Sequence, residues 1–127
     1  MPKPPSTILL VEDEFLIRDY VADHLRDLGF AVFAVGDASQ AIELLAAGAP
    51  VNLVFTDITL PGQVDGIGLA QWVREQRPTL PVILTSGGHN AARAAELGNG
   101  ELFVVKPYDL EVLVEHFRRL LRSTGSP

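Results

Sequence analysis

The stretch Val51-Asn52-Leu53-Val54-Phe55-Thr56-Asp57 decides the fold, because it is a short apolar run that ends in a single carboxylate. Pro50 precedes the run and Pro61-Gly62 follow shortly after it, which is typical of a buried β-strand over Val51–Thr56. Open parallel α/β sheets carry their functional groups at the carboxyl ends of the strands. Asp57 therefore has the position of a functional residue, with a simple turn residue as the alternative interpretation.

Four further apolar runs repeat this pattern and alternate with amphipathic segments. The pattern predicts strands and helices, with the strands over 8–11, 31–35, 51–56, 81–85 and 102–105 and the helices over 14–28, 38–47, 66–76, 90–97 and 109–121. Gly29 is expected to end the first helix and Asp37 to cap the second. The alternation predicts an α/β fold, a doubly wound five-stranded parallel sheet flanked by five helices. We expect a single domain over residues 1–127, with a core over roughly 7–122 and short flexible tails.

The composition excludes several classes of protein. The absence of cysteine rules out a disulfide scaffold and thiolate metal sites. Sixteen acidic side chains against ten Lys and Arg give a net charge of −6, which argues against direct binding of nucleic acid. No apolar stretch approaches the ~18 residues of a membrane span, and the first residues lack the apolar core of a signal peptide. We therefore expect a cytoplasmic protein that does not bind membranes.

Charged side chains lie at the ends of three predicted strands. Glu12-Asp13 follow the first strand, Asp57 ends the third and Lys106 follows the last, so three acids and one base should meet at one edge of the sheet. Two carboxylates ~5 Å apart repel by about 3 kcal/mol at an effective dielectric near 20, so the acids must protonate, separate or bind a cation. Oxygen ligands without His or Cys favour Mg²⁺, which we predict here. For Glu12-Asp13 the alternative is a favourable interaction with a helix dipole.

A hydroxyl group ends the fourth predicted strand. Either Thr85 or Ser86 can supply it, because strand alternation does not choose between them. Lys106 lies between Val105 and Pro107. As a compact point charge, its ammonium suits a phosphoryl oxygen or a carboxylate.

These motifs, in this order, resemble the receiver domain of bacterial two-component response regulators of the chemotaxis-regulator type, over about residues 8–121. The matching pieces are Leu-Val-Glu-Asp-Glu at 10–14, Asp-Ile-Thr-Leu-Pro-Gly at 57–62, Asp65-Gly66, Pro-Val-Ile-Leu-Thr-Ser-Gly at 81–87 and Val-Val-Lys-Pro at 104–107. The resemblance implies a flavodoxin-like sheet with strand order 2-1-3-4-5. It also implies that the Lys106–Pro107 bond is cis.

The resemblance further implies how the acids act. Asp57 would be the phosphoacceptor, whose carboxylate takes a phosphoryl group from a sensor histidine kinase or a histidine phosphotransfer protein. Asp13, Asp57 and the backbone carbonyl of Thr59 would ligate Mg²⁺ directly, whereas Glu12 would act largely through bound water. A carboxylate that attacks phosphorus needs such a cation, and a fixed ammonium, to offset the negative charge.

By the same resemblance, Ser86 and Lys106 would contact the transferred phosphoryl group, and Phe103 would be an aromatic switch. A core aromatic is the alternative interpretation of Phe103. The protein would not be an enzyme acting on separate substrates, since it would catalyse only its own phosphorylation and dephosphorylation. It would then switch the binding of a downstream protein partner, as a monomer or as a weak phosphorylation-dependent dimer.

Other functions fit the motifs less well. A phosphatase of the haloacid dehalogenase type would need a second Asp where Thr59 stands. A flavodoxin-like nucleotide binder would need a phosphate loop where Glu12-Asp13-Glu14 would repel phosphate. A phosphorylation-independent binding module stays open, and so does a fragment of a larger regulator or hybrid kinase, although Met1 and the short tail favour a whole protein.

The 20 positions from Ser86 to Lys106 are about two fewer than is common in the family. The partner-binding face is therefore the part of the resemblance that applies least to this chain.

Overall fold

The computed structural model describes residues 5–87 and 101–124. Nine elements follow one another in this part of the chain: β1 (Thr7–Val11), α1 (Phe15–Asp27), β2 (Ala31–Val35), α2 (Ala38–Ala46), β3 (Leu53–Asp57), α3 (Gly66–Gln76), β4 (Val82–Ser86), β5 (Glu101–Val105) and α4 (Leu110–Thr124). The helix expected over 90–97 lies outside the described residues. The helix expected over 109–121 is α4. β3 begins two residues later than predicted and includes Asp57 as its last residue.

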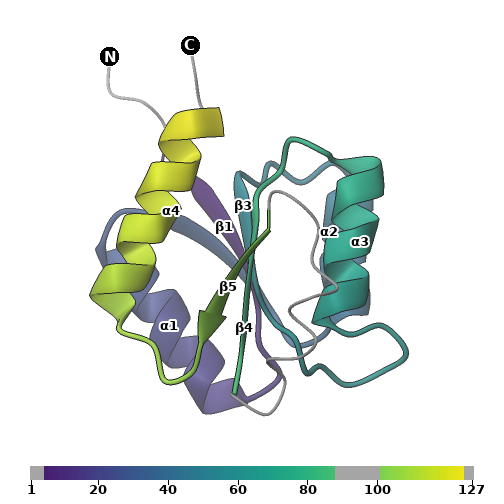
Figure 1. The fold of residues 1–127 in the computed structure, drawn as a ribbon, viewed down its shortest axis with the longest axis horizontal. Helices are drawn as coiled ribbons and strands as arrows, with labels where there is room; N and C mark the ends of the chain where they lie inside the picture. Colours follow the sequence, from purple (N-terminus) through teal and green to yellow (C-terminus); the bar gives the residue numbers. More distant parts are fainter. Residues whose placement is uncertain (1–4, 88–100, 125–127) are drawn as a thin grey trace.

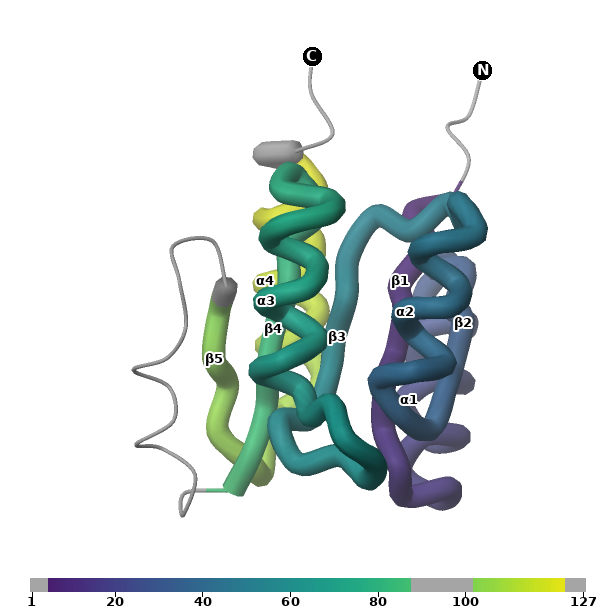
Figure 2. The backbone as a smooth tube through the Cα atoms, turned by 90° about the vertical axis from the view of Figure 1, so that its right-hand side faces the viewer, coloured from purple at the N-terminus to yellow at the C-terminus, as the bar shows by residue number. Residues whose placement is uncertain are grey.

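The five strands form one parallel sheet in the order β2-β1-β3-β4-β5, which confirms the predicted fold and order. Figure 2 shows this order from right to left, with α2 and α3 in front of the sheet. In Figure 1, α1 and α4 lie on one side of the sheet and α2 and α3 on the other. Because helices cover both faces, β3 and β4 are buried along their whole length.

The core is divided by the sheet into two clusters. Leu9, Val54 and Leu84 point toward α2 and α3, where they pack with Leu45 and Leu69. The alternate positions of the same strands pack with α1 and α4, and they include Ile8, Leu10, Phe55 and Ile83. Phe117 of α4 is fully buried at the centre of this second cluster, in edge-to-face contact with Phe30 and Phe55. Period-two alternation in the strands is therefore what places one set of side chains on each face.

The predicted helix ends are confirmed at both positions named from the sequence. Gly29 has φ +99°, and the N–H groups of Gly29 and Phe30 donate to the carbonyls of Arg26 and Leu25, which is a Schellman motif at the end of α1. At the start of α2, the Asp37 carboxylate accepts a hydrogen bond of 2.8 Å from the N–H of Gln40.

Gly66 begins α3 directly against the end of β3. Its N–H donates to the carbonyl of Ile58 at 2.8 Å. A Cβ at this position would overlap the carbonyl oxygen of Asp57 and lie 2.7 Å from the Cα of Ile58. The absence of a side chain at Gly66 therefore permits the contact that holds the end of β3, and with it the backbone of Asp57, against α3.

Candidate functional site

The predicted acids converge at the carboxyl edge of the sheet. Carboxylate oxygens of Glu12, Asp13 and Asp57 all lie within 4.8 Å of one another. Glu12 and Asp57 are almost fully buried, at 5% and 6% exposure, whereas Asp13 is exposed. Three carboxylates at this separation repel one another strongly unless a cation lies between them. This cluster has the donor chemistry of a magnesium site, since all its ligands are oxygens and one side is open to solvent.

Asp57 is held through both of its carboxylate oxygens. The Lys106 ammonium donates to Oδ2 at 2.6 Å, and the backbone N–H of Thr59 donates to Oδ1 at 3.1 Å. The same ammonium lies 3.8 Å from Oε1 of Glu12, so it faces two of the three acids. The sequence allowed a carboxylate or a phosphoryl oxygen as a partner of Lys106, and the carboxylate that it contacts is that of Asp57.

The charge of Lys106 is secured by these contacts. Burial lowers the pKa of the ammonium, but the hydrogen bond and charge of Asp57, together with the charge of Glu12, outweigh that effect and leave the pKa above its ordinary value. Lys106 therefore stays protonated at neutral pH and supplies a permanent positive charge to the site.

Glu12 is fixed through its backbone as well as its side chain. Its N–H donates to the carbonyl of Val35 at 3.0 Å, and its carbonyl accepts from the guanidinium of Arg18 at 2.9 Å. Its carboxylate oxygen Oε2 accepts from the N–H of Glu14 at 3.0 Å. Burial raises the pKa of Glu12, and the Glu14 hydrogen bond and the Lys106 charge oppose this only in part. The cluster is thus a site where added positive charge would be favourable.

Ser86 and Thr85 are both buried at the end of β4. The N–H of Lys106 donates to the carbonyl of Ser86 at 2.9 Å, which ties the lysine to this strand end. The Lys106–Pro107 peptide bond is cis, as the resemblance implies. Phe103 is partly buried and packs with the α2 and α3 side of the core. Its role as a switch stays a prediction.

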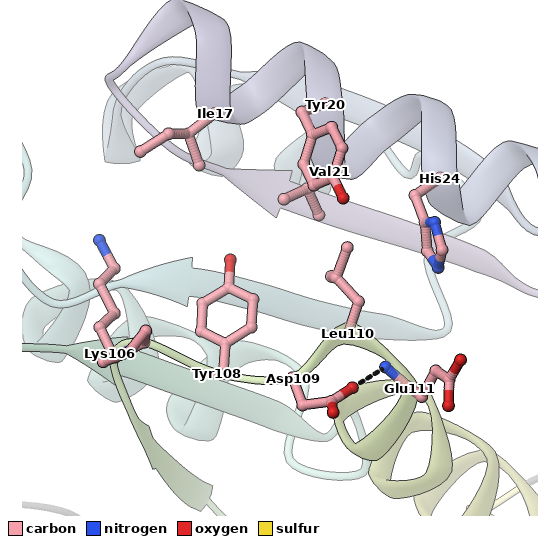
Figure 3. A pocket seen from close by; sticks show the side chains of 10 residues that line it. Ile17, Tyr20, Val21, His24, Lys106, Tyr108, Asp109, Leu110 and Glu111 are labelled. Carbon is pink, nitrogen blue, oxygen red and sulfur yellow. Dashed lines mark hydrogen bonds between the residues drawn. The ribbon is translucent and has the colours of Figure 1, made fainter.

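A pocket of ≈ 830 Å³ opens beside Lys106, between α1 and the start of α4. In Figure 3 the Lys106 ammonium and the Tyr108 hydroxyl point toward the side of α1 that carries Ile17 and Tyr20. The Tyr108 ring packs edge-to-face on Phe55, with 5.6 Å between the ring centroids. Burial, followed by the charges of Glu12 and Asp57, raises the pKa of Tyr108 to about 12. Tyr108 therefore presents a neutral phenol beside the acids.

Sequence reasoning missed two residues of this region, Arg18 and Tyr108. Tyr108 follows directly after Lys106-Pro107, so its place beside the site was a possible inference from chain proximity. Arg18 lies on α1, which has both polar and apolar residues, and nothing in the sequence pattern of that helix indicates that the Arg18 side chain binds the carbonyl of Glu12. Within residues 5–87 and 101–124, none of the helices is long and apolar enough to cross a membrane.

Comparisons with known proteins agree with this arrangement. A family model for the response regulator receiver domain matches residues 8–118. The nitrogen assimilation regulatory protein NtrX of Azorhizobium caulinodans is 36% identical over 119 residues, which cover 91% of this chain and 26% of that protein. The chain thus spans about a quarter of the length of this relative.

Solved structures show the same fold. A response regulator receiver protein from Sinorhizobium medicae matches with a TM-score of 0.88 and 32% identity, over 94% of this chain and 97% of that chain. The receiver domain of NtrX from Brucella abortus matches with a TM-score of 0.78 and 38% identity, over 91% of this chain and 98% of that one. Sequence, fold and the acidic strand ends all agree, and the chain belongs to the response regulator receiver domain family of two-component systems.

Proposed function

We propose that Asp57 accepts a phosphoryl group in a Mg²⁺-dependent reaction and that the modified domain switches the binding of a partner protein. One observation carries this proposal. The buried carboxylate of Asp57 has two further acids within 4.8 Å and the Lys106 ammonium at 2.6 Å. A turn residue at the end of a strand needs none of these neighbours. A phosphoacceptor needs all of them, because charge must be offset at both the attacking and the transferred oxygens.

The acids are suited to Mg²⁺ rather than to a transition metal. The carboxylates of Asp13 and Asp57 and the backbone carbonyl of Thr59 would hold the ion, and Glu12 would act through bound water. When bound, Mg²⁺ would neutralise the negative charge that builds up on the oxygens of the transferred group. The exposed Asp13 lies on the open side, from which a hydrated cation can enter.

Side chains of the protein would carry out the other steps of phosphoryl transfer. A carboxylate oxygen of Asp57 attacks phosphorus, the bond from phosphorus to the donor imidazole breaks, and an aspartyl phosphate forms. Lys106 holds Asp57 in place and offers its positive charge to the new phosphoryl oxygens. The Ser86 hydroxyl would donate a hydrogen bond to the same group. Phe103 would change its position with Ser86 and so alter the surface of the domain. In this proposal the domain catalyses only its own phosphorylation and dephosphorylation.

Receiver domains act between histidine kinases and downstream effectors. For this chain we propose a sensor histidine kinase or a histidine phosphotransfer protein as donor, a protein as the downstream partner, and a cytoplasmic location. We also propose that residues 1–127 fold as a single domain, a monomer or a weak dimer once phosphorylated. The relatives are longer than the region that this chain covers, so their whole-protein activities are not carried over.

Intact mass spectrometry after incubation with Mg²⁺ and a small-molecule phosphodonor tests the proposal. We expect one added phosphoryl group on the wild type, no adduct after chelation of the metal, and no adduct on Asp57→Asn. Asp109→Asn is the matched control, because Asp109 is an exposed acid only three positions from Lys106 and lies outside the acid cluster. An unmodified wild type that still binds Mg²⁺, with rapid hydrolysis controlled for, would favour a phosphorylation-independent binding module instead.

A further inference from the structure

Helix α1 carries two arginines that each donate a side-chain hydrogen bond to a backbone carbonyl. Arg26 donates to the carbonyl of Val32 at 3.0 Å, far along β2 from the acids. Arg18 donates to the carbonyl of Glu12 at 2.9 Å, at the start of the acidic segment. The two bonds have the same chemistry and nearly the same length, but only the second reaches a residue of the proposed cation site.

The bond from Arg18 fixes more than Glu12. A peptide group is planar, so the carbonyl of Glu12 lies in one rigid plane with the nitrogen and Cα of Asp13. The N–H of Glu12 is already bound to Val35, and its carboxylate is bound to the N–H of Glu14. Because Arg18 binds the carbonyl, the N–H, the carbonyl and the carboxylate of Glu12 all have hydrogen-bond partners. The orientation of the Glu12–Asp13 peptide plane, from which Asp13 extends, is therefore fixed as well.

The guanidinium that makes this bond is itself confined. A Cβ at Gly36 would lie 3.1 Å from Nη1 of Arg18, so the guanidinium lies directly against the backbone just after β2. Gly36 is in turn held by a hydrogen bond of 2.9 Å from its N–H to Oε1 of Gln40. The guanidinium also lies over the ring of Phe15, with 5.6 Å between Cζ of Arg18 and the ring centroid. These contacts restrict the orientation of the planar donor.

We propose that Arg18 is a positioning residue for the cation site, holding the Glu12–Asp13 peptide so that both carboxylates face Asp57. This inference rests on the proposed Mg²⁺ site. The direction in which Mg²⁺ affinity changes on removal of Arg18 tests the proposal, because the positive charge of Arg18 close to the site disfavours a cation. If Arg18 acted only through its charge, removing it would tighten Mg²⁺ binding. If it acts by positioning, removing it weakens Mg²⁺ binding despite the lost repulsion.

Calorimetric titration of the full chain with Mg²⁺ alone separates these two cases. We expect Arg18→Met to bind Mg²⁺ about tenfold more weakly than the wild type. Arg26→Met is the matched control, since it removes an equivalent arginine-to-carbonyl bond from the same helix and should leave the Mg²⁺ affinity unchanged. If Arg18→Met does not fold, Arg18→Leu takes its place, because leucine is also a good helix former and likewise removes both the charge and the donor.

A second measurement does not need the metal. Amide hydrogen exchange in metal-free protein should become faster at Glu12 and Glu14 in Arg18→Met, and it should stay at the wild-type rate there in Arg26→Met. Equal or tighter Mg²⁺ binding by Arg18→Met, or by Arg18→Leu where that variant replaces it, would overturn the positioning role and leave the metal site standing. A wild type that binds no Mg²⁺ would instead overturn the proposed site, and the role of Arg18 with it.

Discussion

Thr56 and Thr85 form a matched pair in which the same substitution should change stability in opposite directions. They lie at the ends of the adjacent strands β3 and β4 and are 1% and 2% exposed. The hydroxyl of Thr56 donates to the carbonyl of Asp57 at 3.0 Å. The hydroxyl of Thr85 has no hydrogen-bond partner among the residues that the structure describes. Valine replaces the hydroxyl by a methyl group of nearly the same shape in both cases.

The expected magnitudes follow from what each hydroxyl does. Thr56→Val removes a buried hydrogen bond and leaves the Asp57 carbonyl with one bond fewer, so it should lower the free energy of unfolding by about 1 kcal/mol. Thr85→Val removes a polar group whose desolvation is not compensated, so it should raise the free energy of unfolding by about 1 kcal/mol. The difference of about 2 kcal/mol between the two variants is well above the error of a urea titration.

Urea unfolding followed by circular dichroism, at fixed protein concentration and without Mg²⁺, measures both variants. The reasoning fails if Thr85→Val destabilises the domain as much as Thr56→Val, because its hydroxyl would then have a partner such as a buried water. Thr85→Val, together with Ser86→Ala, also addresses the choice between Thr85 and Ser86. If Ser86 is the donor to the phosphoryl group, Ser86→Ala slows phosphorylation and Thr85→Val does not.

Three further predictions rest on single features of the fold. Gly66→Ala should cost about 1–3 kcal/mol of unfolding free energy and impair phosphorylation as well, because the new Cβ overlaps the Asp57 carbonyl. Gly68→Ala should do less in both assays, because its Cβ would meet side chains rather than backbone, with Val64 Cγ1 at 2.9 Å and Asp65 Oδ1 at 3.7 Å. Phe117→Ala should cost about 3–5 kcal/mol in urea unfolding, because the ring is fully buried, whereas the exposed Val112→Ala should stay within about 0.5 kcal/mol. The Gln40 N–H and the Ser39 hydroxyl lower the pKa of Asp37, so its stabilising effect is present above the unfolded pKa of about 4 and is lost as pH falls through the lower folded value. The stability difference between wild type and Asp37→Ala, measured by urea unfolding at several pH values, should therefore be constant near neutrality and shrink in acid.

The sheet and the acid cluster were predictable because they follow from local patterns joined by one topological rule. Apolar runs mark the strands, and a parallel sheet brings the carboxyl ends of its strands to one edge. Glu12, Asp57 and Lys106 could thus be placed together without knowing any distance. Gly29 and Asp37 could be assigned to helix ends because their roles depend on a few neighbouring residues only.

The missed features depend on geometry that periodicity does not carry. Arg18 reaches the Glu12 carbonyl only because α1 packs against the sheet at a particular distance and Gly36 leaves room for the guanidinium. The start of β3 was predicted too early because Val51 is apolar and buried but lies before the ladder begins. The choice between Thr85 and Ser86 also depends on how the strand end turns, and alternation alone does not describe that turn.

The hydrogen bonds around Asp57 explain how a change at one carboxylate would reach the rest of the domain. Lys106 donates to Oδ2 and the Thr59 N–H donates to Oδ1, so a phosphoryl group on either oxygen would change the hydrogen bond of one of the two donors. Displacement of Thr59 moves the segment that leads from β3 toward α3. Displacement of the Lys106 ammonium frees the side chain of a residue whose backbone N–H is bonded to the Ser86 carbonyl at the end of β4. We therefore expect phosphorylation of Asp57, as proposed, to change contacts beyond that carboxylate, because both of its donors belong to segments that are bonded to a second element.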